Sequence, residues 1–285
     1  MSRPPHPAPY EARLLEAAKP RSALESPRDR GVAVGRAMPV SIEAAHAVLS
    51  AAVAAAPGIT SLATLPRRVR DQRDTECCVS CAVAGAVESL HTSWDILSPV
   101  FHYYVTRFLK GASDAQGRLK IDDAIATLIT HGICREADHS SVFDDAGIRR
   151  SPEPAAFSDA ASRTLQRRGL TFPVQQIAST SRAADVRSHL RGGDPVILVF
   201  TLPMGYPSSF LNDANEWLNP GVPPGSASHH CVLAVGFDDL RGDGSVRGAV
   251  RVWDSAGARP SEDGTWWLGY RVLDSEVTQQ AFVLT

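Results

Sequence analysis

The sequence lacks the features that mark several classes of protein. Its formal net charge is only -2, its pI is near 6.5, and no long run of one sign is present. A basic field that would attract nucleic acid is therefore missing. The most apolar runs, 196–202 and 231–237, are far shorter than the roughly 20 residues that cross a bilayer. We expect neither a nucleic-acid partner nor a membrane-spanning helix.

The sequence also lacks a recognisable secretory signal and a disulfide framework. The first eleven residues contain four prolines and no continuous apolar core, unlike a signal peptide. The five cysteines are odd in number, and three of them crowd together at Cys77, Cys78 and Cys81. This pattern favours free thiols over disulfides. We expect a cytoplasmic protein, although secretion without a leader would leave the same pattern.

What is present predicts one α+β protein with two lobes. The 285 residues, 44% of them hydrophobic, can supply a proper buried core. Periodicity and end signals predict helices over 41–56, 78–90, 98–109 and 121–130. Strands are predicted over 194–200, 230–237, 248–253 and 266–272. We expect a helical lobe over about 61–170 and a β lobe over about 171–285 that could meet along a cleft, after an N-terminal extension over 1–60.

Cys78 stands at the predicted start of a helix. The helix macrodipole and the free N–H groups at that end favour a thiolate over a thiol. Cys78 is therefore a candidate nucleophile. A buried core cysteine would produce the same local pattern.

Two further segments carry candidate catalytic residues. His230 opens an apolar strand, where it could serve as base and then as acid. Asp254 ends another strand and enters a glycine-containing turn, where a carboxylate could orient the imidazole. A structural histidine and a turn-forming aspartate are the ordinary alternatives.

Taken together, these segments resemble the papain family of cysteine peptidases, especially its short bacterial members. That family places a Gln six residues before the catalytic Cys and typically a Glu ten residues after it, which matches Gln72, Cys78 and Glu88. The sequence from His230 to Phe237 resembles the strand that begins with the family's histidine. Asp254-Ser255-Ala256-Gly257 resembles the Asn-Ser-x-Gly turn of the family, with Asp in place of Asn. The resemblance covers about residues 60–285.

The resemblance implies a papain-like fold with the active site in the cleft between the lobes. It also implies a cysteine peptidase that acts on a peptide or protein without a metal or organic cofactor. Cys78 would be the nucleophile, His230 its base, Asp254 the residue that orients the base, and Gln72 an oxyanion donor. The extension over 1–60 would be a candidate pro-segment that restrains activity, or else a solvated tail with one docked helix. The oligomeric state is not predicted.

Three further positions depart from the family pattern. Thr75 stands where secreted relatives have a disulfide cysteine, which is consistent with a reducing compartment. Val79 and Ala256 replace two tryptophans that usually shield the site. Cys81 is a rival nucleophile because Ser80-Cys81 mimics the family's Ser-Cys pair, but it breaks the intervals to both Gln72 and Glu88.

Other functions can be drawn from the same residues. Zinc binding would use soft ligands from two clusters, namely Cys77, Cys78, Cys81, His229, His230 and Cys231. A dithiol switch would use Cys78 and Cys81, but no βαβ unit precedes them. A papain-like fold could also serve a pseudoenzyme, or an acyl or amide transferase that uses the same thioester.

Overall fold

The computed structural model describes residues 58–61, 66, 68–91, 95–112, 117–164, 175–177, 182–221, 224–243, 246–257 and 263–284. The helix predicted over 41–56, and nearly all of the extension over 1–60, lie outside these residues. In the described part of the chain, no helix combines the length and the apolar character that a bilayer span requires.

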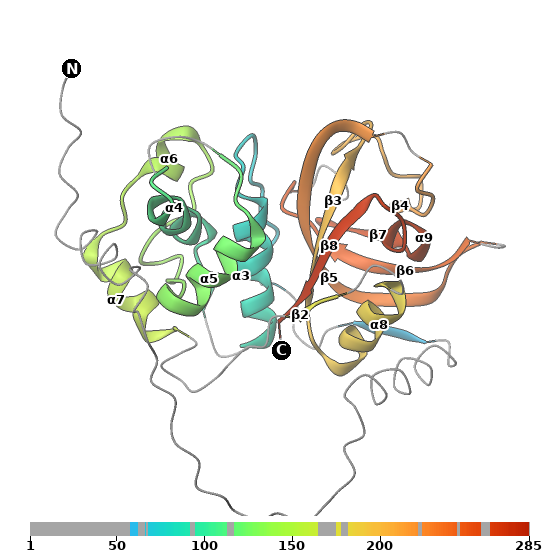
Figure 1. Ribbon diagram of the computed structural model, residues 1–285, viewed down its shortest axis with the longest axis horizontal. Helices are drawn as coiled ribbons and strands as arrows, with labels where there is room; N and C mark the ends of the chain where they lie inside the picture. Colours follow the sequence, from blue (N-terminus) through green and yellow to red (C-terminus); the bar gives the residue numbers. More distant parts are fainter. Residues whose placement is uncertain are drawn as a thin grey trace, which may run out of the picture.

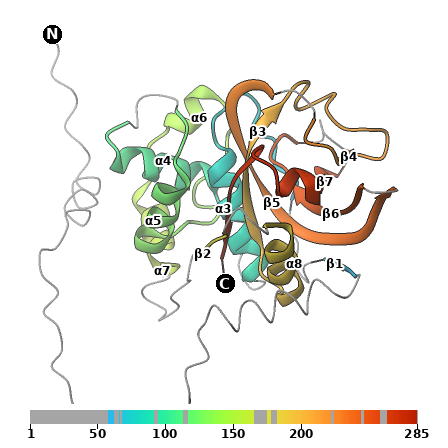
Figure 2. The same cartoon turned by 45° about the vertical axis from the view of Figure 1, so that its right-hand side comes forward.

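The chain forms a helical part and a sheet part that lie side by side (Figure 1). The helical part contains α3 (Cys78–Leu90), α4 (Pro99–Leu109), α5 (Ile121–His131), α6 (Asp145–Arg149) and α7 (Pro154–Ser162). The sheet part also carries α8 (Arg182–Gly192) and α9 (Tyr270–Leu273). Both views place α3 between the other helices and the sheet (Figure 2).

The described residues form one sheet of eight strands with the order β2-β8-β3-β5-β6-β7-β4, and β1 pairs with β5 off this path. The strands are β1 (Ile59–Ser61), β2 (Gln175–Gln176), β3 (Val196–Pro203), β4 (Glu216–Trp217), β5 (Pro224–Asp243), β6 (Val246–Trp253), β7 (Thr265–Gly269) and β8 (Thr278–Val283). The pairing is antiparallel throughout, except that β4 and β7 run parallel. The α+β class predicted from the sequence is confirmed.

Helix α3 is buried on nearly all sides, because it lies between the sheet and the other helices. Every residue from Cys78 to Glu88 is buried. At Gly85 an added Cβ would lie 3.2 Å from a Leu233 methyl group and 3.3 Å from Pro66 Cγ. The glycine therefore lets the helix approach strand β5 closely, which brings its N-terminus to the boundary between the two parts.

The predicted elements differ from the structure in several places. Strand β5 begins at Pro224, so His230 lies within the strand and does not open it. The sequence did not predict strands β1, β2, β4 and β8 or helices α6 and α7. The strand predicted over 266–272 is wrong beyond Gly269, where the chain turns into α9. Val272 and Leu273 are fully buried by that helical turn, so their apolar character reflects burial and not strand alternation. Helix α8 lies in a region predicted to be mainly β. Its mean hydropathy is low and most of its buried residues are small or charged, so a hydrophobic pattern does not reveal it.

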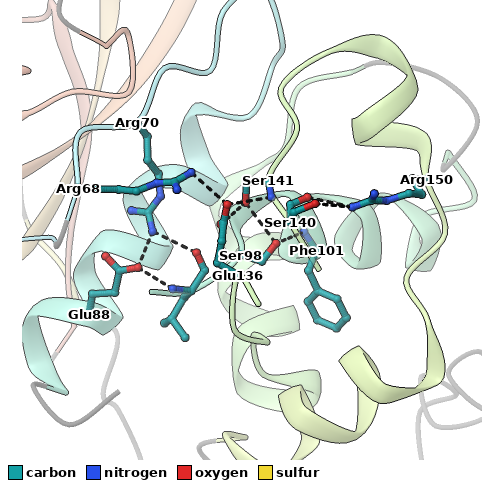
Figure 3. Close-up of polar contacts among 10 residues, drawn as sticks. Arg68, Arg70, Glu88, Ser98, Phe101, Glu136, Ser140, Ser141 and Arg150 are labelled. Carbon is teal, nitrogen blue, oxygen red and sulfur yellow. Dashed lines mark hydrogen bonds and ion pairs between the residues drawn. The ribbon is translucent and has the colours of Figure 1, made fainter. Parts of the chain in front are cut away.

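A buried ion pair fixes the segment that leads into the candidate site (Figure 3). Arg70 Nη2 donates to Glu88 Oε1, and both side chains are fully buried. The same carboxylate accepts from the Leu97 backbone N–H at 2.8 Å, and Arg70 donates to the Leu97 carbonyl at 3.2 Å. Nearby, Arg68 pairs with Glu136 at 3.0 Å. The end of α3 thus anchors residue 70, two positions before Gln72.

Candidate active site

Cys78 is the first residue of α3 and lies at the boundary between the helices and the sheet. Its side chain is almost buried, with 7% of its surface exposed, and it lines two hollows that open at this boundary. The first N–H groups of a helix have no partner within the helix and point out from its N-terminus. They provide a positive end for an anion next to the thiol.

His230 lies on β5 opposite Phe200 of β3, with its imidazole between Cys78 and Asp254. Its Nε2 atom is 2.8 Å from Asp254 Oδ1, so Nδ1 is the ring nitrogen left for Cys78. Burial disfavours the imidazolium, but the charge and hydrogen bond of Asp254, followed by the contact with Cys78, outweigh it and raise the pKa of His230 to about 10. The imidazole is therefore protonated at neutral pH.

Asp254 follows β6 directly and is completely buried. Burial alone would raise its pKa, but the charge of His230 and hydrogen bonds hold that pKa below the ordinary value of 3.8. Oδ1 accepts from His230 and from the Ala256 backbone N–H at 2.9 Å, while Oδ2 accepts from Trp266 Nε1 at 2.9 Å. Both oxygens thus face donors, which suits a carboxylate.

Gln72 reaches the same place by pairing with the turn that follows Asp254. Its backbone N–H donates to the Ser255 carbonyl at 2.7 Å, and the Ser255 hydroxyl donates to Gln72 Oε1 at 2.5 Å. Gln72 Nε2 donates to the Thr75 carbonyl at 2.7 Å. This hydrogen bond fixes the position of the amide group and uses one of its two N–H donors. Gln72 and Cys78 line the same hollow.

Gly257 makes this pairing possible. It adopts a φ of +74°, and a Cβ there would lie 2.9 Å from the side chain of Asp71. Asp71 is bridged to Ala256, so a larger residue at 257 would push the Gln72 segment away from the turn.

The structure also brings two side chains to the site that sequence reasoning missed. Tyr206 Oη is 2.7 Å from His230 Nε2 and 3.1 Å from each oxygen of Asp254. Trp266 binds the same carboxylate from β7. Tyr206 stands in the connection after β3, which matches no motif. Only the path of that connection in three dimensions identifies it.

The expected loss of shielding at Val79 and Ala256 is compensated by other aromatic residues. Tyr206 packs on the imidazole of His230 with 4.9 Å between ring centroids, and Phe200 contacts it edge-on at 5.8 Å. Only 5% of the surface of His230 remains exposed. Phe200 belongs to an aromatic cluster that also contains Phe210, Trp217 and Trp266.

Two hollows meet at the candidate site, with volumes of about 540 Å³ and about 240 Å³. Both are lined by Glu76, Cys78, Arg118, His229 and His230. The larger one continues over the start of α5 and the strands β3 and β8, and the smaller one continues over Gln72 and Tyr206.

Arg118 crosses this cleft. From the loop before α5, its Nε donates to Glu76 at 3.1 Å on the helical side, and its Nη2 donates to the Ser228 hydroxyl at 2.8 Å on β5. The Arg118 side chain is 52% exposed and that of Glu76 is 37% exposed. Ion pairs as exposed as this contribute about 0–1 kcal/mol, so the bridge can open at little cost.

The other cysteines are placed differently from Cys78. Cys81 is fully buried in a cluster with Val100 and Tyr103, lines neither hollow, and has a pKa that burial raises well above 9. Burial raises the pKa of Cys77 to about 12. All five cysteines are free thiols. Within the described ranges, no three His, Cys, Asp or Glu side chains come together as a metal-binding group.

Comparison with known proteins identifies the fold. Neither a protein-family model nor a curated protein matches the chain in sequence. Among solved structures, xylellain, a cysteine protease from Xylella fastidiosa, superposes with a TM-score of 0.66 and 22% identity over 82% of this chain and 88% of that one.

Two further solved structures are similar at lower identity. The digestive procathepsin L 3 of Tenebrio molitor larval midgut gives a TM-score of 0.54 and 15% identity over 80% of this chain and 69% of that one. A recombinant stem bromelain precursor gives a TM-score of 0.56 and 12% identity over 82% of this chain and 72% of that one. The chain therefore has the fold of the papain-like cysteine proteases.

Proposed function

We propose that this protein is a cysteine peptidase that hydrolyses peptide bonds through a thioester on Cys78. The observation that carries the proposal is the contact of Cys78, at the N-terminus of α3, with the His230 imidazole, which faces the buried Asp254 carboxylate at 2.8 Å on its other side. This carboxylate favours the protonated imidazole. An imidazolium next to a cysteine at a helix N-terminus favours the thiolate, which is the nucleophilic form.

In the proposed reaction, the Cys78 thiolate attacks the carbonyl carbon of a peptide bond. The oxyanion that forms accepts hydrogen bonds from the Gln72 amide and the Cys78 backbone N–H. His230 gives its proton to the leaving amine as the thioester forms. The imidazole then takes a proton from water, which attacks the thioester and releases the second product and the thiolate.

The surroundings of the site support this use of the residues. The Gln72 amide and the Cys78 thiol line one hollow, so a carbonyl oxygen bound there could reach both donors. The hollows on either side of Cys78 offer space for a chain that extends in two directions. A peptide or protein is therefore the proposed substrate class.

Two cysteine variants test the proposal. Cys78→Ala should abolish cleavage of a mixed peptide library, whereas Cys81→Ala should retain it, because Cys81 is buried away from both hollows. A thiol-reactive peptide epoxide followed by mass spectrometry should label Cys78 alone. Labelling without cleavage of any peptide would favour an acyl or amide transferase. Full activity of Cys78→Ala would refute the proposal.

A further inference from the structure

We propose that Tyr206 is a positioning residue of the Cys78–His230 pair, whose hydroxyl joins the imidazole to Asp254 and whose ring shields that contact from water. This inference rests on the peptidase function proposed above and goes beyond it. Tyr206 is half-buried in the connection between β3 and β4 and lines the smaller hollow. It therefore forms a wall of the site and is not part of the deep core.

The proton inventory of the three side chains fixes the role of the hydroxyl. An ionised carboxylate only accepts hydrogen bonds, so the Tyr206 proton points to Asp254, 3.1 Å away. The Tyr206 oxygen then turns its lone pairs to His230 Nε2, 2.7 Å away. The Nε2 proton is shared between the carboxylate and this oxygen. With Nε2 held on two sides, Nδ1 stays directed at Cys78.

The ring of Tyr206 supplies the cover that Ala256 cannot. Its centroid lies 4.9 Å from that of His230 and 5.2 Å from that of Phe210. Ala256 lies in the wall of the same hollow, but its single methyl group is too small to cover the imidazole. The Tyr206 ring, on the β3–β4 connection, covers it instead. Because charges interact more strongly where water is excluded, this cover strengthens the contact between His230 and Asp254.

The direction of the hydroxyl dipole determines how its loss should act. Within the described residues, the titratable groups that contact His230 are Cys78 from α3, Asp254 from the turn after β6 and Tyr206 from the β3–β4 connection. Glu76 and Arg118 line the hollow beside them. The Tyr206 oxygen, which is the negative end of the hydroxyl dipole, lies next to His230 Nε2. It therefore stabilises the positive charge of the imidazolium. Removal of the hydroxyl should lower the pKa of His230.

Tyr206→Phe is the deciding variant, because it keeps the ring and removes only the hydroxyl. We expect kcat/KM at pH 7 to fall by about 10-fold, as for a lost hydrogen bond to a charged group, with KM within a factor of about two. The alkaline limb of the pH profile should move down by about 1 pH unit. A residue that only fills space would leave both quantities unchanged.

Tyr270→Phe is the matched control, because Tyr270 also donates its hydroxyl to a carboxylate, that of Asp239 at 2.6 Å, but lines neither hollow. It should keep the pH profile of the wild type. Should Tyr206→Phe fail to fold, Tyr206→Met fills similar space without a hydroxyl and should show the same shift.

Alkylation of the wild type by iodoacetamide separates the two proposals. If Cys78 of the wild type reacts no faster at pH 6 than an ordinary thiol, the peptidase function fails and the role of Tyr206 fails with it. If Cys78 is reactive and Tyr206→Phe has the wild-type rate and alkaline limb, only the role of Tyr206 is overturned.

Discussion

Replacing Asp254 by asparagine probes the charge at the centre of the site. Asparagine is the residue that the papain family places here, so the change would be mild if this site followed the family pattern. In this chain both oxygens face donors, with Trp266 Nε1 at 2.9 Å from Oδ2 and His230 Nε2 at 2.8 Å from Oδ1. The amide of Asp254→Asn would place its NH₂ group in the position of either Oδ1 or Oδ2. In both cases that NH₂ group would face another N–H donor.

The magnitude of the effect follows from the charge that is lost. The difference between the His230 pKa of about 10 and its ordinary value of 6.5 corresponds to about 5 kcal/mol at most. Asp254 supplies the largest favourable part of that difference. Without its charge, burial of the imidazole is opposed only by Cys78 and by the Tyr206 oxygen. We expect the alkaline limb to fall by about 2 pH units or more, and kcat/KM at pH 7 to fall by about 10²-fold.

The assay is the pH dependence of kcat/KM for one peptide, measured for wild type and Asp254→Asn from pH 4 to 11. Circular dichroism at each pH would verify that both proteins stay folded. Asp145→Asn is a suitable control, because it makes the same chemical change at an exposed position on α6 that lines neither hollow. An unchanged alkaline limb in folded Asp254→Asn would show that the carboxylate does not set the protonation of His230.

The remaining predictions concern the oxyanion, the cleft and the stability of the fold. Gln72→Ala should slow turnover by about 10²-fold if the amide donates to the oxyanion, and a rate within a factor of about two of wild type would remove Gln72 from the mechanism. Arg118→Ala should speed labelling of Cys78 by a bulky peptide epoxide but not by iodoacetamide, because only a large reagent must displace the Arg118 bridge between Glu76 and Ser228. The control is Arg149→Ala, which breaks an exposed ion pair on α6. Folding stability of Cys78→Ala should fall between pH 7 and 8.5, by up to about 1.4 kcal/mol per pH unit, because Asp254 raises the pKa of His230 and the folded state keeps a proton that the unfolded state has lost. The wild type should show little slope in this window, because the proposed thiolate–imidazolium pair holds as many protons as the unfolded thiol and imidazole together. Urea titrations should show the slope in Cys78→Ala but not in Cys78→Ala/His230→Ala.

Sequence reasoning located the elements whose patterns are local. Helix α3 carries a continuous run of buried small and apolar residues, and β5 is an apolar strand that pairs on both sides, so both leave clear patterns. The candidate residues Cys78, His230 and Asp254 were found because each stands near the end of a predicted element, and Gln72 was found because its interval to Cys78 matches the papain family. The structure brings all four to the same boundary.

The features that were missed depend on contacts between distant segments. Tyr206 lies 48 positions from Asp254 on a connection without a repeating pattern, so no spacing rule relates the two residues. Helix α8 was missed for a similar reason. Its Arg187 is buried against Asp239 and over the ring of Phe237, so a residue that counts as polar in the sequence is part of the packed interior.

The departures from the family pattern at 254 and 256, together with Tyr206, fit one rearrangement. Asp254 provides two carboxylate oxygens, which accept hydrogen bonds from Tyr206 and Trp266. Ala256 is too small to cover the imidazole, and the Tyr206 ring covers it instead. If the hydroxyl acts through the carboxylate, its contribution depends on the charge of Asp254, because that charge orients its proton. The losses should then be non-additive, as expected for residues in one network.

A double-mutant cycle of Tyr206→Phe and Asp254→Asn tests this coupling. The loss of kcat/KM in the double variant should be smaller than the product of the two single losses, because an amide no longer orients the hydroxyl and its removal then changes little. Tyr270→Phe combined with Asp254→Asn should give the simple product, since Tyr270 binds Asp239 and not Asp254. Simple multiplication in the Tyr206 cycle as well would mean that the hydroxyl and the carboxylate act on His230 independently.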